Sequence, residues 1–169
     1  VPGDTYVVPY NNIDALEAMF EKNAKKIACF IVEPVLENLA IILPDAGYLE
    51  RVRELCDQYN VVLIFDEVKT GLTAGAHGAS ARLGVKPDLI TLAKSIGGGL
   101  PLAAFGGKKK YMDFVTNGKM AHFGTFNGNP LAMAGVRAID RICSDQVLVD
   151  AEAMNLQALT RIGEVIDEY

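Results

Sequence analysis

The sequence predicts an α/β fold in which a mainly parallel sheet is flanked by helices, and three observations support this prediction. Short apolar runs rich in β-branched residues alternate with amphipathic helical segments along the chain, which is the pattern of βα units joined by right-handed crossovers. Charged residues first appear directly after two of the apolar runs. Three consecutive glycines also occur close to the end of one run, where they let the backbone turn sharply.

The first half of the chain contains two predicted helices and two predicted strands. The helices cover residues 13–23, capped by asparagines 11–12, and residues 48–59. The strands cover residues 27–32 (IACFIV), which we expect to be buried, and residues 61–65 (VVLIF), whose continuous apolar character predicts burial on both faces. The second helix has an apolar inner face formed by Leu49, Val52, Leu55 and Cys56.

The second half continues the alternation. Strands are predicted over residues 89–92, after a Pro-Asp turn, and over residues 102–107. The three lysines at 108–110 are predicted to form a solvated surface. A helix begins near Pro130, at its first turn, and a long helix covers residues 146–169. The inward face of the helix after Pro130 is predicted to contain Leu131, Ala134, Val136 and Ile139.

Length and composition place limits on the class of protein. The chain has 169 residues, of which 50% are hydrophobic and 22% are charged, as expected for one globular domain. A net charge of −5 argues against partners such as nucleic acid or an anionic membrane. The three cysteines, Cys29, Cys56 and Cys143, lack metal-ligand spacing. We predict reduced, buried thiols in a cytoplasmic protein, and no metal site.

Two charged residues at the ends of apolar runs suggest a specific chemistry. Asp66 follows the strand at 61–65, and Lys94 follows the apolar run at 89–92, which are the strand ends where open α/β sheets bind ligands. A lysine amine can hold pyridoxal phosphate (PLP) as a Schiff base, while an acid keeps the ring nitrogen protonated. The lysine can then transfer a proton. Either residue alone is more simply explained as a turn cap or a solvated lysine, but together they predict a PLP site.

Three segments of the chain resemble the class III (fold type I) PLP-dependent aminotransferases. They are DEVKTG (66–71), PDLITLAKSIGGGLPLAAFGG (87–107) and HFGTFNGNPLAM (122–133). The nearest subgroup is that of glutamate-1-semialdehyde aminomutase and related β-amino-acid aminotransferases. The resemblance implies that residues 1–140 are part of the large PLP-binding domain and that residues 141–169 form a helix leading into a C-terminal α+β domain. Complete members of this family are longer, so we expect a fragment.

The resemblance also implies roles for residues beyond Asp66 and Lys94. Val68 would pack against one face of the pyridine ring, for which a rigid β-branched side chain is suited. Gly124 and Thr125 would bind the cofactor phosphate of the neighbouring subunit, which implies a homodimer with shared active sites. Glu33 ends a strand whose following loop reaches the cofactor. Asn38 would lie near the 3-oxygen of the cofactor, although satisfying local backbone groups explains this loop asparagine equally well.

The implied function is a PLP-dependent aminotransferase that moves an amino group between an amino acid or β/ω-amine and a keto or aldehyde acceptor. The runner-up within enzymes is the aminomutase reaction on glutamate-1-semialdehyde. Lys69, where the aminomutase usually has methionine, and the smaller, less aromatic loop after it weigh mildly against this reaction. Glu37 and Leu39 stand where the family usually has small residues, so the loop that contains Asn38 departs from the family pattern. A truncated, non-catalytic module and a lysine Schiff-base enzyme without PLP are also compatible with the sequence. The sequence does not identify the amino donor or acceptor.

Overall fold

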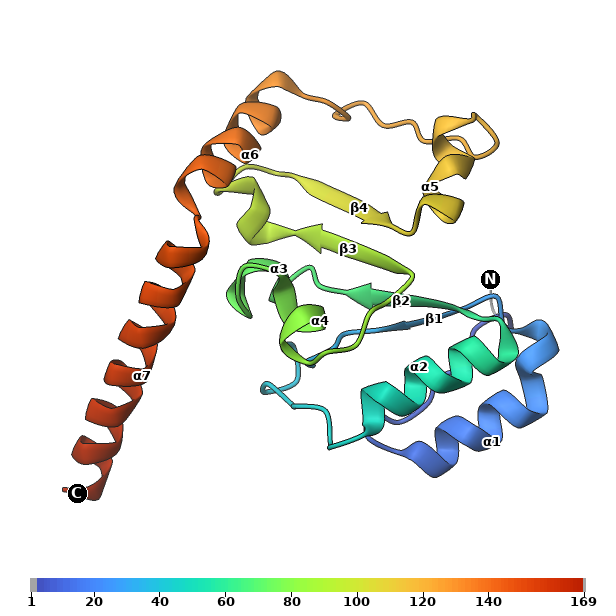
Figure 1. Ribbon diagram of the computed structural model, residues 1–169, viewed down its shortest axis with the longest axis horizontal. Coiled ribbons are helices and arrows are strands. Elements are labelled where there is room, and N and C mark those ends of the chain that lie inside the picture. Colours follow the sequence, from blue (N-terminus) through green and yellow to red (C-terminus); the bar gives the residue numbers. More distant parts are fainter. Residues whose placement is uncertain (1–2, 169) are drawn as a thin grey trace.

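The computed structural model describes residues 3–168, and its centre is a four-stranded sheet with the order β1-β2-β3-β4 (Figure 1). The strands β1 (Cys29–Val32), β2 (Val62–Asp66) and β3 (Leu89–Ala93) are parallel, and β4 (Ala103–Gly107) pairs with β3 in the antiparallel direction. The predicted α/β fold with a mainly parallel sheet is confirmed. The carboxyl ends of β2 and β3 therefore lie at the same edge of the sheet.

Two helices cover one face of this sheet. They are α1 (Ile13–Asn23) and α2 (Tyr48–Tyr59), which lie side by side (Figure 1) and begin and end where the sequence predicts. Asn12 starts α1 by accepting a hydrogen bond from the backbone N–H of Ala15 at 2.8 Å. The core between these helices and the sheet contains Leu16, Phe20, Tyr48, Leu49, Val52, Leu55, Cys56, Val61, Leu63, Phe65 and Val85.

The remaining helices lie before β1, in the connections between strands and after β4. A short 3₁₀ helix, η1, follows α1, two short helices connect β2 to β3, and the 3₁₀ helix η2 begins directly after β3. The sequence does not predict the helix after β4, whose first residues are lysines. The bounds are η1 (Ala24–Lys26), α3 (Thr70–Thr73), α4 (Gly78–Arg82), η2 (Lys94–Gly97), α5 (Lys109–Thr116), α6 (Pro130–Ile142) and α7 (Asp145–Asp167).

The strands are less buried than predicted. In β1, Phe30 and Val32 pack against the core, but Cys29 is exposed and Ile31 is 60% exposed. In β2, the face opposite the core is only half-buried. The prediction of a buried thiol is therefore wrong for Cys29, because no described segment covers that face of β1. It holds for Cys56, where burial raises the thiol pKa to about 12.

The helix α6 also differs from the prediction in which residues it buries. Leu131 and Ala134 are exposed, whereas Ala132 is buried and Ile139 contacts the turn at Gly98. The reason is that α6 packs against η2 rather than against the sheet. The helix α7 extends past the sheet (Figure 1) and exposes Val149, Met154, Leu156, Leu159, Ile162, Val165 and Ile166. Among residues 3–168, no helix is both long and apolar enough to cross a membrane.

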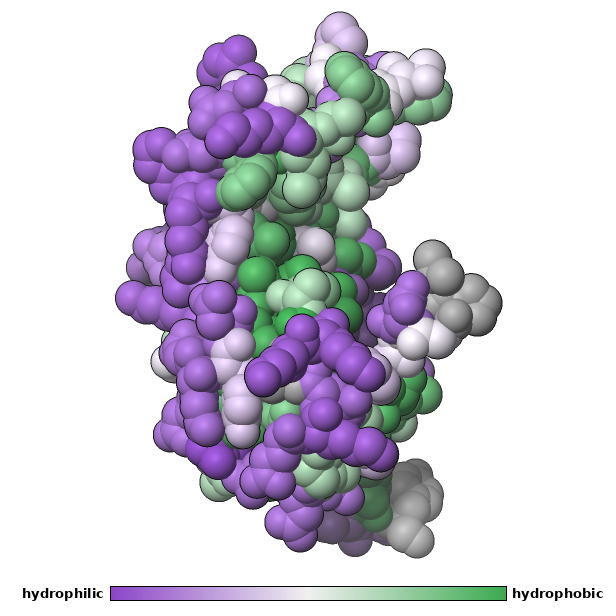
Figure 2. All heavy atoms as spheres, turned by 90° about the vertical axis from the view of Figure 1, so that its right-hand side faces the viewer, coloured by the Kyte–Doolittle hydropathy of each residue, from purple (hydrophilic) through white to green (hydrophobic). Residues whose placement is uncertain are grey.

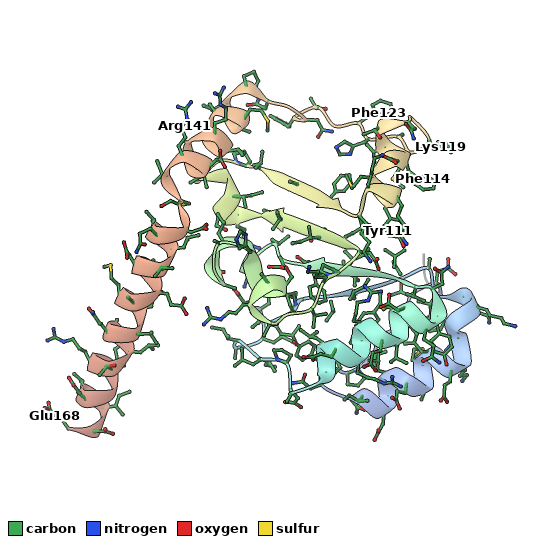
Figure 3. All side chains as sticks on the ribbon, viewed as in Figure 1. Tyr111, Phe114, Lys119, Phe123, Arg141 and Glu168 are labelled. Atoms are coloured by element: carbon green, nitrogen blue, oxygen red, sulfur yellow. The ribbon has the colours of Figure 1, made fainter. Side chains whose placement is uncertain are left out.

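Apolar side chains are exposed elsewhere as well. Figure 2 shows apolar surface across the middle of the side that lies to the right in Figure 1, between hydrophilic regions. Phe114, Lys119 and Phe123 come from α5 and the segment after it, at one end of the molecule (Figure 3). The Lys119 ammonium lies 5.8 Å from the centroid of the Phe114 ring, while Phe123 is 93% exposed. This end of the molecule thus exposes aromatic side chains.

A buried carboxylate joins the start of β3 to α2 and β4. The side chain of Asp88 is 4% exposed, and Arg53 and Lys108 each approach one of its oxygens, at 3.0 and 2.6 Å. The backbone N–H of Leu63 donates to the same carboxylate at 2.9 Å. Lys108 is exposed, as predicted for a solvated surface, but its ammonium also pairs with this buried carboxylate, which the sequence does not predict. Burial raises the pKa of Asp88, but the hydrogen bonds from Lys108, Leu63 and Arg53 outweigh it and hold the pKa below its ordinary value.

We expect Asp88→Asn to lower the free energy of unfolding by about 2–3 kcal/mol near neutral pH, because it leaves two cations without their shared partner. A depressed folded-state pKa gives stability that is present above the unfolded pKa and lost as the pH falls through the folded value. The difference between wild type and variant should therefore shrink below about pH 4. Denaturant unfolding at a series of pH values measures it, with Glu21→Gln on the exposed side of α1 as control. A difference independent of pH would contradict this assignment.

Candidate active site

The pairing of β2 with β3 sets the geometry of the candidate site. Asp66 is the last residue of β2 and lies opposite Thr91 of β3. Lys94 follows Ala93, the last residue of β3, and begins η2. Because the two strands are parallel, the acid and the lysine lie at the same edge of the sheet. The structure thus brings these two predicted site residues to neighbouring strand ends.

The Asp66 carboxylate is held through one of its two oxygens. Oδ1 accepts a hydrogen bond from the backbone N–H of Val68 at 3.0 Å and another from the hydroxyl of Thr91 at 3.2 Å. Among residues 3–168, Oδ2 accepts none. Asp66 therefore does cap the following turn, as the simpler explanation requires, but this role uses only Oδ1. The second oxygen of this half-buried side chain is left for a ligand.

Lys94 adopts a backbone conformation that is unusual for a residue with a side chain. Its φ of 51° lies in the left-handed region, which costs a non-glycine residue about 1–2 kcal/mol. Strain of this kind is concentrated at functional sites. The residue is also exposed. The long side chain is therefore accessible to a ligand at the sheet edge.

Small residues allow α6 to approach the turn that carries Lys94. A Cβ atom on Gly135 of α6 would lie 3.1 Å from the carbonyl oxygen of Gly97. The chain then turns through Gly98 and Gly99, both with positive φ, as their sequence predicts. Within the described residues, the Ser95 hydroxyl in this turn is buried without a hydrogen-bond partner. The turn after β3 is therefore fixed by close packing, and it leaves one polar atom unsatisfied.

Glu67, next to Asp66, fixes the loop between β2 and β3. Its side chain is fully buried, and its Oε2 accepts hydrogen bonds from the Thr70 hydroxyl (3.2 Å) and the Ala79 N–H (2.7 Å). Oε1 accepts from the Ser80 N–H at 3.0 Å. Gly78 has to be glycine, because its φ is 69° and a Cβ there would overlap the carboxylate. Glu67 thus ties the end of β2 to the start of α4.

We expect Glu67→Gln to destabilise the protein by roughly 2–3 kcal/mol. Both carboxylate oxygens of Glu67 accept hydrogen bonds from backbone N–H groups. The glutamine side chain has only one oxygen, so its NH₂ group would face one of these N–H donors. The loss of stability should appear first in the loop between β2 and β3. Hydrogen exchange at residues 70–84 should accelerate, and the thermal unfolding midpoint should fall. Glu50→Gln, on the exposed face of α2, serves as the matched control. Unchanged exchange in this loop would show that the Glu67 contacts do not hold it.

The other predicted residues fall into two groups. Glu33 follows β1 level with Asp66 on β2, and Val68 lies two residues beyond Asp66, so both are near the same edge. Asn38 is exposed in a loop closed by the bridge between Leu36 and Ile42. No hydrogen bond among the described residues joins this asparagine to Asp66 or Lys94. It is therefore placed on the loop that follows β1, and no contact fixes its role.

Gly124 and Thr125 lie in a different part of the molecule. The backbone N–H of Asn127 donates to the carbonyl of Gly124 at 3.0 Å, which forms an exposed turn. The segment between α5 and α6 that contains it runs beyond β4, at the opposite side of the sheet from β1 (Figure 1). Within the described residues, no hydrogen bond connects this turn to Asp66 or Lys94. A single chain therefore does not bring all the predicted site residues together at one site.

Two residues of the site are absent from the sequence-based prediction of functional residues. Thr91 contacts Asp66 through its hydroxyl, and Glu67 organises the adjacent loop. A polar residue inside the apolar run before Lys94 is a signal that could have identified Thr91. The signal for Glu67 is weaker, because an acid next to Asp66 resembles any other charge at a strand end. No group of three or more His, Cys, Asp or Glu side chains in residues 3–168 is arranged to hold a metal ion.

The described residues fit the requirements of PLP at two points. The free Oδ2 of Asp66 is an acceptor for a protonated ring nitrogen, and the accessible amine of Lys94 is at the end of the neighbouring strand. The buried, unpartnered Ser95 hydroxyl is a further polar group at this turn. A solved transaminase with PLP bound is similar to this chain, with 29% identity over 86% of this chain and 37% of that one, and a TM-score of 0.78.

Comparisons with known proteins cover most of the chain. A family model described as aminotransferase class-III matches residues 2–167. A glutamate-1-semialdehyde 2,1-aminomutase from Cytophaga hutchinsonii is 49% identical over 140 residues, which is 82% of this chain and 33% of that protein. The chain thus spans about a third of the length of this curated relative.

Solved structures with other activities are similar as well. An omega-transaminase from Sphaerobacter thermophilus is 33% identical, with a TM-score of 0.88, over 96% of this chain and 38% of that one. A β-phenylalanine aminotransferase from Variovorax paradoxus is 38% identical, with a TM-score of 0.78, over 82% of this chain and 33% of that one. The proteins similar to this chain thus include two named as transaminases and one named as an aminomutase.

Proposed function

Because this chain belongs to the class III aminotransferase family, which is PLP-dependent, we propose that the protein containing it is an aminotransferase acting between an amino acid or β/ω-amine and a keto or aldehyde acceptor. One observation carries this proposal. The carboxylate of Asp66, with one oxygen free, and the accessible amine of Lys94 end two adjacent parallel strands. This pair supplies the two protein groups that PLP chemistry requires.

Each group has a defined task in the proposed reaction. Lys94 would hold the cofactor through Nζ, and its amine would move the proton at the substrate α-carbon. Oδ2 of Asp66 keeps the ring nitrogen protonated, while its Oδ1 stays bonded to Val68 and Thr91. When bound, PLP supplies the electron sink that stabilises negative charge on the substrate carbon. The side chain of Val68 packs against the ring and excludes water from it.

We further propose that Glu33 and Asn38 line the site from the loop after β1, and that Gly124 and Thr125 act across a homodimer. The separation of this glycine and threonine from Lys94 within one chain supports a role in a second subunit's site. The exposure of their neighbours supports it too, because Phe123 is 93% and Phe126 is 76% exposed. Apolar surface of this kind is typical of an interface.

The second candidate function is intramolecular amino transfer by an aminomutase. It is favoured by the 49% identity to a protein with that name, whereas Lys69 stands where methionine is usual. The two functions are separated by supplying the wild-type enzyme with glutamate-1-semialdehyde alone, or with an amino donor and a keto acceptor. Conversion of the single substrate supports the aminomutase. Conversion that requires both supports the aminotransferase.

The proposal as a whole is tested with the protein expressed from its complete reading frame. It is incubated with PLP, reduced with borohydride and digested, and the peptide that carries the cofactor is identified by mass spectrometry. We expect the added mass on Lys94. Attachment to a different lysine would remove Lys94 from its role. Absence of any attachment and of any PLP-dependent absorbance would support a non-catalytic module or a Schiff-base enzyme without PLP.

A further inference from the structure

Thr91 is bonded to the end of β2 through both its backbone and its side chain. The hydroxyl donates to Oδ1 of Asp66 at 3.2 Å, and the carbonyl accepts from the N–H of Glu67 at 3.0 Å. Thr91 lies on β3, three residues before Lys94. Its hydrogen bonds therefore link β3, which leads to the lysine, to β2, which ends with the acid.

The hydroxyl of Thr91 restricts the Asp66 carboxylate in a specific way. A single donor, the N–H of Val68, would leave the carboxylate free to rotate about its terminal bond, because this torsion is broad. A second donor on the same oxygen, from the neighbouring strand, sets the plane of the group. The β-branched side chain of Thr91 is itself stiff about χ1. Together the two donors fix Oδ1 and so determine where Oδ2 points.

We propose that Thr91 is a positioning residue, whose hydroxyl orients the Asp66 carboxylate so that Oδ2 meets the ring nitrogen of the cofactor. This inference rests on the proposed function, because it needs a ring nitrogen at Asp66. It predicts that Thr91 affects cofactor binding only through that nitrogen. A role in folding alone would instead affect the stability of the sheet without regard to the chemistry of the ring.

The test compares two substitutions at one position in the protein expressed from its complete reading frame. Thr91→Val keeps the shape of the side chain and removes the donor, whereas Thr91→Ser keeps the donor. We expect Thr91→Val to weaken PLP binding about tenfold, which corresponds to one ordinary hydrogen bond. Thr91→Ser should remain within about threefold of wild type. The binding is followed by PLP absorbance at equilibrium, and thermal unfolding without PLP reports on the sheet.

The carbocyclic analogue of PLP, in which a carbon replaces the ring nitrogen, provides the decisive control. We expect wild type and Thr91→Val to bind this analogue with equal affinity, because the analogue has no ring nitrogen for Oδ2 of Asp66 to contact. In the Asp66→Ala background, Thr91→Val should cause no further loss for PLP itself. A tenfold loss for PLP, equal binding of the analogue and rescue by Thr91→Ser support the inference.

Two different outcomes separate the failure of this inference from the failure of the proposed function. Wild type that binds PLP on Lys94, with Thr91→Val binding it equally well, overturns the positioning role alone. Equal losses for PLP and its carbocyclic analogue overturn it too, because they show a general effect on the site. Wild type that binds no PLP overturns the proposed function and the inference with it.

Discussion

Lys94→Ala is expected to reduce amino transfer by roughly 10²–10⁴-fold, the size of a lost general acid–base, and to abolish attachment of the cofactor. The amine of Lys94 is accessible at the end of β3, and its left-handed backbone is held by the glycine turn and by the packing of α6. A side chain without an amine can neither bind the cofactor covalently nor carry the proton. The measurements are the rate with the best wild-type donor and the mass trapped by borohydride.

Two further variants separate chemistry from folding at this position. Lys94→Gly also removes the amine, but its backbone tolerates a φ of 51° without strain. We therefore expect it to be as inactive as Lys94→Ala and to unfold at a higher temperature. Lys86→Ala, at an exposed position before β3, should keep wild-type activity. Cofactor still trapped in Lys94→Ala, with an undiminished rate, would exclude this lysine from the reaction.

The sequence predicts that Asp66 and Lys94 lie at the same edge of the sheet, because the pattern of apolar runs sets the strands and their ends. A continuous run such as VVLIF is recognisable from local order alone. The helices α1 and α2 are predicted equally well, since the asparagine cap of α1 and the apolar stripes of both helices are local signals. Burial is predicted less well. Cys29 and Leu131 are exposed because burial depends on which distant segments cover a face, and a strand's own sequence does not contain that information.

The contacts inside the site depend on pairing between segments that are distant in sequence. Thr91 meets Asp66 only because β2 and β3 pair in one particular register. Glu67 is buried because the chain returns to it twelve residues later, at Ala79. Neither contact can be predicted from a short stretch of neighbouring residues. The helix α5 escapes prediction for a different reason, because lysines at its start resemble a solvated loop.

Asp66→Asn is expected to lower kcat by roughly 10²–10³-fold, the cost of removing a single preorganised electrostatic contact in an active site. Asparagine is nearly isosteric with aspartate, and its carbonyl oxygen can still accept from Val68 and Thr91. The amide group would then occupy the place of Oδ2. It carries no negative charge and presents N–H donors, so it cannot keep a ring nitrogen protonated. Steady-state kinetics with saturating PLP measures this loss.

The same substitution shows whether Asp66 acts on the cofactor or only on the turn. Because the contacts of Oδ1 survive in Asp66→Asn, the thermal unfolding midpoint without PLP should stay close to that of wild type. Asp140→Asn, on the exposed surface of α6, should change neither activity nor stability. A large loss of kcat with an unchanged midpoint assigns the role to the free oxygen. A loss that appears only together with a lower midpoint would mean that the carboxylate caps the turn after β2 and does nothing more.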